Sequence, residues 1–172
     1  MEKYVWLFPI IFIVHDMEEI IGFGIWLKKN KALLDEKYPS ISKTYKDFST
    51  EGFSLAVLEE MILCIILCLL ALFTGNSNKY IWCIWLGGFI ACTLHFVIHI
   101  GQAIIMRQYI PATITSILFL PVSIWIIIKS IAELSLQATE LIIFSVIGII
   151  IVALNLKLAQ SLIGKFTRKM KL

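Results

Sequence analysis

The sequence predicts an all-α integral membrane protein, a bundle of five transmembrane helices that forms a single domain over residues 1–172. Hydrophobic residues make up 59% of the chain, whereas soluble domains contain about 45–50%. The mean hydropathy is +0.90. Five apolar segments are each long enough for a bilayer span of about 17–25 residues. We expect helices, because in lipid every backbone polar group needs a partner within its own segment or a closed barrel.

The predicted membrane helices are residues 4–27, 53–74, 80–106, 109–128 and 140–163. The fourth is the shortest, and Pro121 is expected to kink it. A basic loop of residues 28–52 follows the first helix. This loop holds either a short interfacial helix before Pro39 or a solvated linker.

Basic residues are distributed unevenly between the two ends of these helices. Lys3, Lys79 and Lys129 lie at one end, whereas the other end has the lysines of the 28–52 loop, Arg107 and the basic C-terminal segment. Cytoplasmic loops carry an excess of Lys and Arg. We therefore expect the N-terminus outside, the C-terminus and the 28–52 loop in the cytoplasm, and a multi-pass protein of the cell membrane. The formal charge of +3 is small, so membrane lipid and not nucleic acid is the expected partner.

Polar residues interrupt the predicted helices at a common depth. At about 1.5 Å of rise per residue, they lie roughly 17–28 Å from the outer surface. The members of this layer are His15, Glu19, Glu59, Glu60, His95, His99, Thr113, Thr115, Ser116 and Asn155. Ionisable groups inside a membrane are costly and are functional candidates by default.

Helical periodicity divides the acidic residues between faces. His15, Glu18 and Glu19 follow an i, i+3, i+4 spacing and share one face, whereas Asp16 is expected to point elsewhere. Glu60 shares its face with small residues that favour helix contact, so it is the predicted inward carboxylate of its helix.

A metal site explains this combination of residues. Several close carboxylates cannot all ionise in a low dielectric unless a cation balances them. Imidazole and carboxylate together bind zinc, iron or manganese. We predict one or two divalent ions, zinc or iron. The predicted ligands are His15, Glu19, Glu60, His95 and His99. The predicted catalytic residues are Glu18 and Glu59, and the residues expected to orient ligands or substrate are Asp16, Gln102, Thr113, Ser116 and Asn155.

The predicted function is that of a metal-dependent membrane enzyme acting on a lipid or another apolar substrate. Hydrolysis is preferred to di-iron-type oxidation, although a carboxylate-rich set also suits di-iron. The alternative is a proton- or ion-translocating protein that uses the same histidines and glutamates. A third hypothesis is a small partner protein that docks through its 28–52 loop. The four cysteines lie in apolar runs without CxxC spacing and are expected to be buried free thiols.

The HDMEE stretch at residues 15–19 resembles the signature of the HXXEE-domain family, bacterial integral membrane proteins of largely unassigned function. EE at 59–60, HxxxH at 95–99 and YIPATITS at 109–116 resemble other shared blocks of that family. The family's fourth-helix block usually has Pro-Gly where this chain has Pro111 and Ala112. The resemblance implies a protein of the bacterial inner or plasma membrane with metal-dependent activity, and it supplies no substrate.

Overall fold

The computed structural model describes residues 1–75 and 77–170. It confirms the all-α prediction, because the described residues form seven α-helices and one 3-10 turn. In chain order these elements are η1 (Glu2–Tyr4), α1 (Leu7–Lys29), α2 (Lys31–Lys37), α3 (Pro39–Thr44), α4 (Thr50–Thr74), α5 (Lys79–Met106), α6 (Thr113–Leu134) and α7 (Ala138–Met170).

Four helices of the described chain are long and apolar enough to cross a membrane, namely α4, α5, α6 and α7. Helix α1 has 23 residues, which is long enough to span, but its middle carries Asp16, Glu18 and Glu19. Composition thus identifies four of the five predicted membrane helices. The 28–52 loop is not a simple linker, because α2 ends at Lys37, before Pro39, and α3 begins at that proline.

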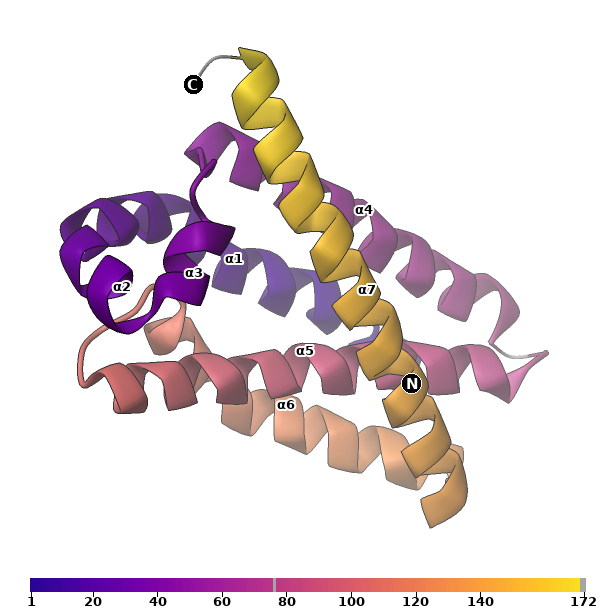
Figure 1. The fold of residues 1–172 in the computed structure, drawn as a ribbon. Helices are drawn as coiled ribbons and strands as arrows, with labels where there is room; N and C mark the ends of the chain where they lie inside the picture. Colours follow the sequence, from indigo (N-terminus) through magenta and orange to yellow (C-terminus); the bar gives the residue numbers. More distant parts are fainter. Residues whose placement is uncertain (76, 171–172) are drawn as a thin grey trace.

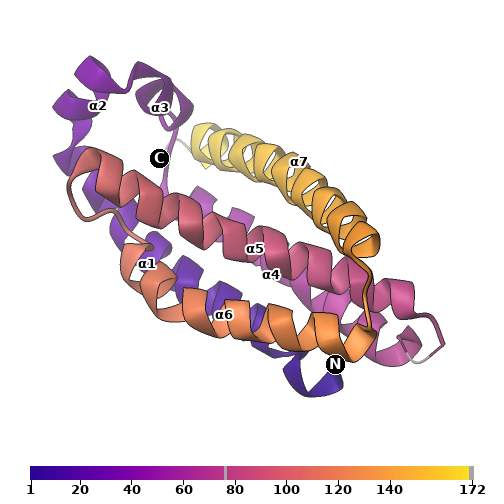
Figure 2. The same cartoon turned by 90° about the horizontal axis from the view of Figure 1, so that it is seen from below.

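The long helices form a bundle in which α1 and α7 lie on opposite sides of α4 and α5 (Figures 1 and 2). Helix α6 packs along α5, and α1 contacts both α4 and α6. The short helices α2 and α3 lie together at the end of the bundle where α1 ends and the α5–α6 connection begins (Figure 1). This arrangement leaves α1, α4, α5 and α7 around a common interior.

The two ends of the bundle are tied by ion pairs between distant segments. Lys3 contacts Glu133 at 2.8 Å, and Lys79 contacts Glu140 at 2.8 Å. At the opposite end, Arg168 contacts Asp47 at 2.5 Å. Exposed pairs of this kind contribute little to stability. These pairs show which ends of the helices lie next to each other.

Helices α5 and α7 cross in direct backbone contact. A Cβ atom added to Gly87 would lie 2.2 Å from the carbonyl oxygen of Phe144, and one added to Gly148 would lie 2.2 Å from the carbonyl oxygen of Gly87. Small residues allow membrane helices to approach this closely. Because the two helices diverge on either side of the crossing (Figure 1), the C-terminal half of α7 is held over the interior without filling it.

The predicted start of the fourth membrane helix is wrong by four residues. The prediction placed it at Tyr109, but α6 begins at Thr113, after Pro111 and Ala112. Ala112 has φ 77°, in the left-handed region. A non-glycine residue there costs about 1–2 kcal/mol. Helix α6 continues through Pro121 to Leu134, beyond the predicted end at residue 128.

The glycine crossing can be tested with a matched pair of substitutions on α5. Gly87→Ala is expected to lower the free energy of unfolding by about 1–3 kcal/mol, because its methyl group overlaps the α7 backbone. Gly101 has no atom within 4 Å of an added Cβ, so Gly101→Ala is expected to raise stability by about 0.5–1 kcal/mol, as alanine does elsewhere in helices. Thermal unfolding in detergent measures both, and equal effects would contradict the close crossing.

Candidate functional site

Helices α1, α4, α5 and α7, with α3 at one end, surround a cavity of about 530 Å³. Eight of the residues singled out in the sequence line it, namely His15, Asp16, Glu19, Glu60, His95, His99, Gln102 and Asn155. The rest of its wall is largely apolar. Residues from four helices far apart in the sequence therefore share one interior space.

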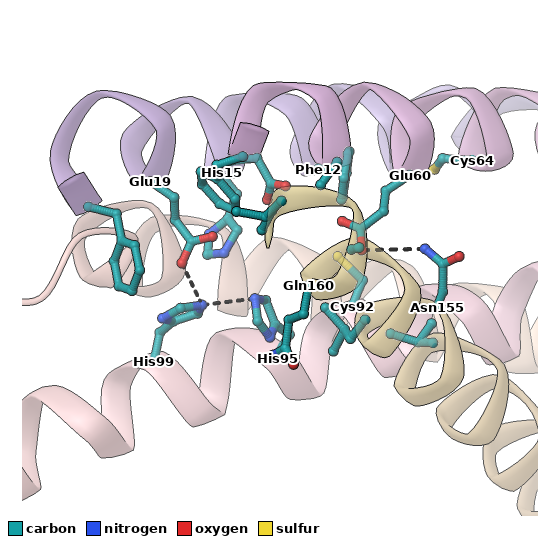
Figure 3. A pocket seen from close by; sticks show the side chains of 18 of the residues that line it. Phe12, His15, Glu19, Glu60, Cys64, Cys92, His95, His99, Asn155 and Gln160 are labelled. Atoms are coloured by element: carbon teal, nitrogen blue, oxygen red, sulfur yellow. Dashed lines mark hydrogen bonds and ion pairs between the residues drawn. The ribbon is translucent and has the colours of Figure 1, made fainter. Parts of the chain in front are cut away.

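All three histidines of the chain converge at this cavity. One donor atom from each of His15, His95 and His99 lies within 4.8 Å of the other two. The Nε2 atoms of His95 and His99 are 2.8 Å apart. Glu19 reaches the same point, with its Oε1 3.3 Å from Nε2 of His99 (Figure 3). The i, i+4 spacing on α5 and on α1 aims both pairs of side chains at the same place.

His15 is oriented by a hydrogen-bonded chain that ends at Glu18. The Thr115 hydroxyl donates to Oε2 of Glu18 at 2.7 Å, and Oγ1 of Thr115 also lies 3.1 Å from Nδ1 of His15. Since the Thr115 hydroxyl donates its hydrogen bond to the carboxylate, its oxygen accepts a hydrogen bond from the protonated Nδ1 of His15. The lone pair of His15 is then on Nε2, which is buried and has no hydrogen-bond partner in the described chain. Metal-binding histidines are commonly held in this way through the second nitrogen.

Glu18 itself lies against the N-terminus of α6. Its carboxylate accepts the backbone N–H groups of Ile114 and Thr115, at 3.3 and 2.8 Å, in addition to the Thr115 hydroxyl. The Tyr109 hydroxyl donates to it at 2.7 Å. Burial, and then this hydrogen bond, raise the pKa of Tyr109 to about 12, so Tyr109 remains a donor. An acidic side chain is favourable at a helix N-terminus, where the first N–H groups lack partners.

This position changes the role expected for Glu18. The sequence predicted it as a catalytic residue on the inward face of α1, whereas its two oxygens accept four hydrogen bonds and it does not line the cavity. The position of Asp16 also differs from the prediction, but in the opposite way. It was expected to point away, but it lines the cavity and is only 5% exposed.

The same stretch before α6 is held to α1 by two further contacts. Nε1 of Trp26 donates to the Tyr109 carbonyl at 3.0 Å. A Cβ atom on Gly22 would lie 3.0 Å from Cγ of Pro111, so the absence of a side chain at Gly22 allows α1 to approach the proline. Helix α1 therefore positions both its own histidine and the residues that orient it.

Glu60 forms a second polar group in the cavity, beside the histidines (Figure 3). Asn155 of α7 donates to Glu60 at 3.4 Å and to Glu59 at 3.3 Å. Glu60, a predicted ligand, is not among the donors that converge on one point in the described residues. Glu59, a predicted catalytic residue, does not line the cavity. Asn155 thus joins two adjacent carboxylates to α7.

Two of the remaining predicted residues lie outside the cavity. Thr113 donates to the carbonyl oxygen of Ile110, and Ser116 is fully buried in α6. Thr115, which contacts both His15 and Glu18, is absent from the predicted set of site residues. Its depth in the same layer as the histidines was the available signal.

The histidine group fits a metal ion. A tetrahedral zinc ion with Zn–N bonds of about 2.0–2.1 Å separates its ligand nitrogens by about 3.3 Å. This separation lies between the 2.8 Å that divides the Nε2 atoms of His95 and His99 and the 4.8 Å within which all three donor atoms lie. Asp16, Glu19 and Glu60 place three carboxyl groups on the wall, and no Lys or Arg lines the cavity in the described part of the chain. A bound cation would balance the charge of any of these groups that ionises. All four cysteines are free thiols, as predicted, and none belongs to the histidine group.

A family described as a protein of unknown function with an HXXEE motif matches residues 6–126 of the chain. The chain belongs to the HXXEE family. The matched residues include His15, Glu18, Glu19 and both α5 histidines, and they end before α7, which supplies Asn155. Comparison with curated proteins and with solved structures found no match. The family description gives no activity, so the function has to be argued from the site.

The hydrogen bonds that link Glu18, Thr115 and His15 can be tested by changing Thr115. Thr115→Val removes the hydroxyl that orients His15 and is expected to lower zinc affinity by about 10–100-fold, as loss of such partners does in other metal sites. Thr115→Ser keeps the hydroxyl and is the matched control. Zinc affinity is measured by competition with a chelator. A Thr115→Val protein that binds zinc like the wild type would show that His15 needs no such support.

Proposed function

We propose that this protein is a membrane hydrolase that uses one divalent metal ion, zinc, to cleave an ester bond in a lipid. The observation that supports it is the convergence of His15, His95 and His99 in a cavity that has carboxylates and no described Lys or Arg. Three histidines leave one position of a tetrahedral ion open, the arrangement of several catalytic zinc sites.

The donor set favours zinc over a di-iron centre. Di-iron bundle proteins use carboxylates from several helices as ligands and as bridges between the ions. Here the converging donors are three imidazoles, while Glu60 is hydrogen-bonded to Asn155 to one side. An imidazole set also suits copper, iron and nickel, so the metal bound in the cell is a measured quantity in the test below.

When bound, the metal would polarise the ester carbonyl and lower the pKa of a water molecule. Glu19 is the carboxylate nearest the histidines, and we assign it the proton transfer. Water adds its oxygen to the acyl carbon, the acyl C–O bond breaks, and Glu19 passes the proton of the water to the departing alkoxide. The products are a fatty acid and an alcohol, and no oxidant or reductant is needed.

The membrane placement is part of the same proposal. We infer that α1 is the fifth membrane helix, with the N-terminus outside and the C-terminus in the cytoplasm. Support comes from the acidic residues of α1, since Asp16 and Glu19 face the cavity and Glu18 faces α6. Charged groups that face the protein interior are tolerated in membrane helices. The basic residues at the α2–α3 end agree with a cytoplasmic location of that end.

Ion translocation, the alternative, would require a polar path beyond the histidines. Toward the N-terminal end of α1, the described structure has a packed aromatic cluster of Phe8, Trp85 and Phe89. Trp85 and Phe89 are fully buried and stacked at 5.3 Å. This cluster offers no ionisable side chain beyond the histidines at that end of the described bundle, which favours a pocket over a path for ions.

Metal content provides the first test. Wild-type protein purified in detergent is expected to carry close to one metal ion per chain, and His99→Ala is expected to lose it. Gln102→Ala changes another cavity residue of the same helix and is expected to retain the metal, as is Glu60→Gln. Elemental analysis measures all four proteins. Wild-type protein without bound metal, after purification without chelators, would contradict the proposal.

Turnover provides the second test. Zinc-loaded protein is expected to release fatty acid from ester lipids in mixed micelles. Glu19→Gln is expected to lower kcat by about 10²–10⁴-fold, the usual contribution of a general acid–base group, while it keeps the metal. Glu36→Gln changes an exposed glutamate of α2 and serves as the matched control. Equal activity of the Glu19 variant and the wild type would exclude this role for Glu19.

A further inference from the structure

A second cavity, of about 300 Å³, lies between the end of α3 with the residues that follow it and the C-terminal part of α7. Its wall contains the cations Lys43, Lys46 and Arg168 and a single carboxylate, Asp47. Nη1 of Arg168 donates to Asp47 at 2.5 Å, which leaves the other guanidinium N–H groups available. The excess of positive charge suits an anion, and Arg and Lys are the usual partners of phosphate.

The wall of this cavity is held in place from both sides. Oγ of Ser49 and Oγ1 of Thr167 are 2.7 Å apart and buried, which joins the segment before α4 to α7. Gly52 lies against α7 as well, since an added Cβ would be 3.0 Å from the Ile163 carbonyl oxygen. The basic residues therefore extend from a fixed framework.

The two cavities have walls in common. Thr44, Tyr45, Gln160 and Ile163 line both. Burial, and then the charge of Glu19, raise the pKa of Tyr45 to about 12, so this shared wall carries a neutral hydroxyl. The basic cavity and the large one are therefore direct neighbours at this wall.

The large cavity is long. Helix α5 lines it from Ile84 to Met106, with His95 and His99 between them. At about 1.5 Å per residue this stretch measures about 33 Å. This length can accommodate the acyl chain of a phospholipid.

We propose that the two cavities together bind one anionic phospholipid, its phosphate between Lys43, Lys46 and Arg168 and one acyl chain in the large cavity. The ester that links the two parts then lies on the side of the histidines nearer α3. Basic pockets between membrane helices at the cytoplasmic side are known sites for anionic headgroups. The inference rests on the proposed function for the choice of substrate, although the binding itself requires no metal.

The test compares lipid binding by native mass spectrometry of the full chain in detergent, with metal removed by chelation. Wild-type protein is expected to bind phosphatidylglycerol at least tenfold more tightly than phosphatidylcholine of the same chains. Lys43→Gln/Lys46→Gln is expected to lose this preference. Lys29→Gln/Lys37→Gln removes two exposed lysines that line neither cavity, and it is expected to keep the preference.

Three results would overturn the proposal. They are an unchanged preference in the Lys43/Lys46 variant, an equal loss in the Lys29/Lys37 control, and full displacement of the lipid by inorganic phosphate at millimolar concentration. The last result would indicate a site for free phosphate.

A second variant tests the acyl chain. A Cβ on Gly88 has ordinary contacts of 3.5 Å with Leu67 and Phe8, so a larger side chain there projects into the cavity. Gly88→Leu is expected to weaken binding of long-chain phosphatidylglycerol at least tenfold and to leave a short-chain analogue unaffected. Equal effects on both chain lengths would contradict the assignment of the chain. Thermal unfolding of every variant shows that it is folded.

The outcomes for lipid and metal are separable. His99→Ala is expected to lose metal and to keep the preference for phosphatidylglycerol, whereas Lys43→Gln/Lys46→Gln is expected to keep metal and to lose that preference. Failure of lipid binding alone leaves the metal site standing, and failure of metal binding alone leaves the lipid site standing.

Discussion

The interaction of Glu18 with the N-terminus of α6 determines how this site is assembled. One carboxylate from the middle of α1 takes the place of a capping residue on a helix almost a hundred positions later in the chain, and accepts two of its backbone N–H groups. A helix that starts inside a membrane protein needs such acceptors, because lipid offers none. The same carboxylate fixes the Thr115 hydroxyl, and that hydroxyl fixes His15. The contacts by which Glu18 caps α6 therefore also orient His15, a candidate metal ligand.

A second constraint is the cost of placing carboxylates in an apolar interior. Glu18 has backbone and hydroxyl donors, and Glu60 has the amide of Asn155. Asp16 and Glu19 have no cationic side chain beside them in the described cavity wall. A divalent ion at the histidines would supply the missing charge, which links the electrostatic problem to the proposed chemistry.

Helix α7 connects the histidine cavity with the basic end of the bundle. It touches α5 at a pair of glycines, lies over the cavity with its C-terminal half, and ends beside the basic residues that follow α3. All of the groups proposed for metal binding and proton transfer lie within residues 6–126, the part that matches the family, whereas α7 lies beyond it. Under the proposed function, α1 and α5 would provide the chemistry, and α7 with the α3 segment would provide the wall against which a lipid lies.

Local properties of the sequence were enough to predict the helices and the three histidines. Hydropathy and length identify a long apolar helix from its own residues, and i, i+4 spacing places His95 and His99 together wherever α5 lies. The directions of Asp16 and Glu18 could not be obtained in this way. Both lie near the boundary between two faces of α1, and the neighbouring helix decides which face is inside. The start of α6 was missed for a related reason, since the backbone before it, which includes the left-handed Ala112, is held to α1 through Tyr109 and Pro111. The sequence by itself thus predicted which residues lie at a similar level along the helices. Only the tertiary structure decided which of them meet, because packing between helices far apart in the chain sets their rotation.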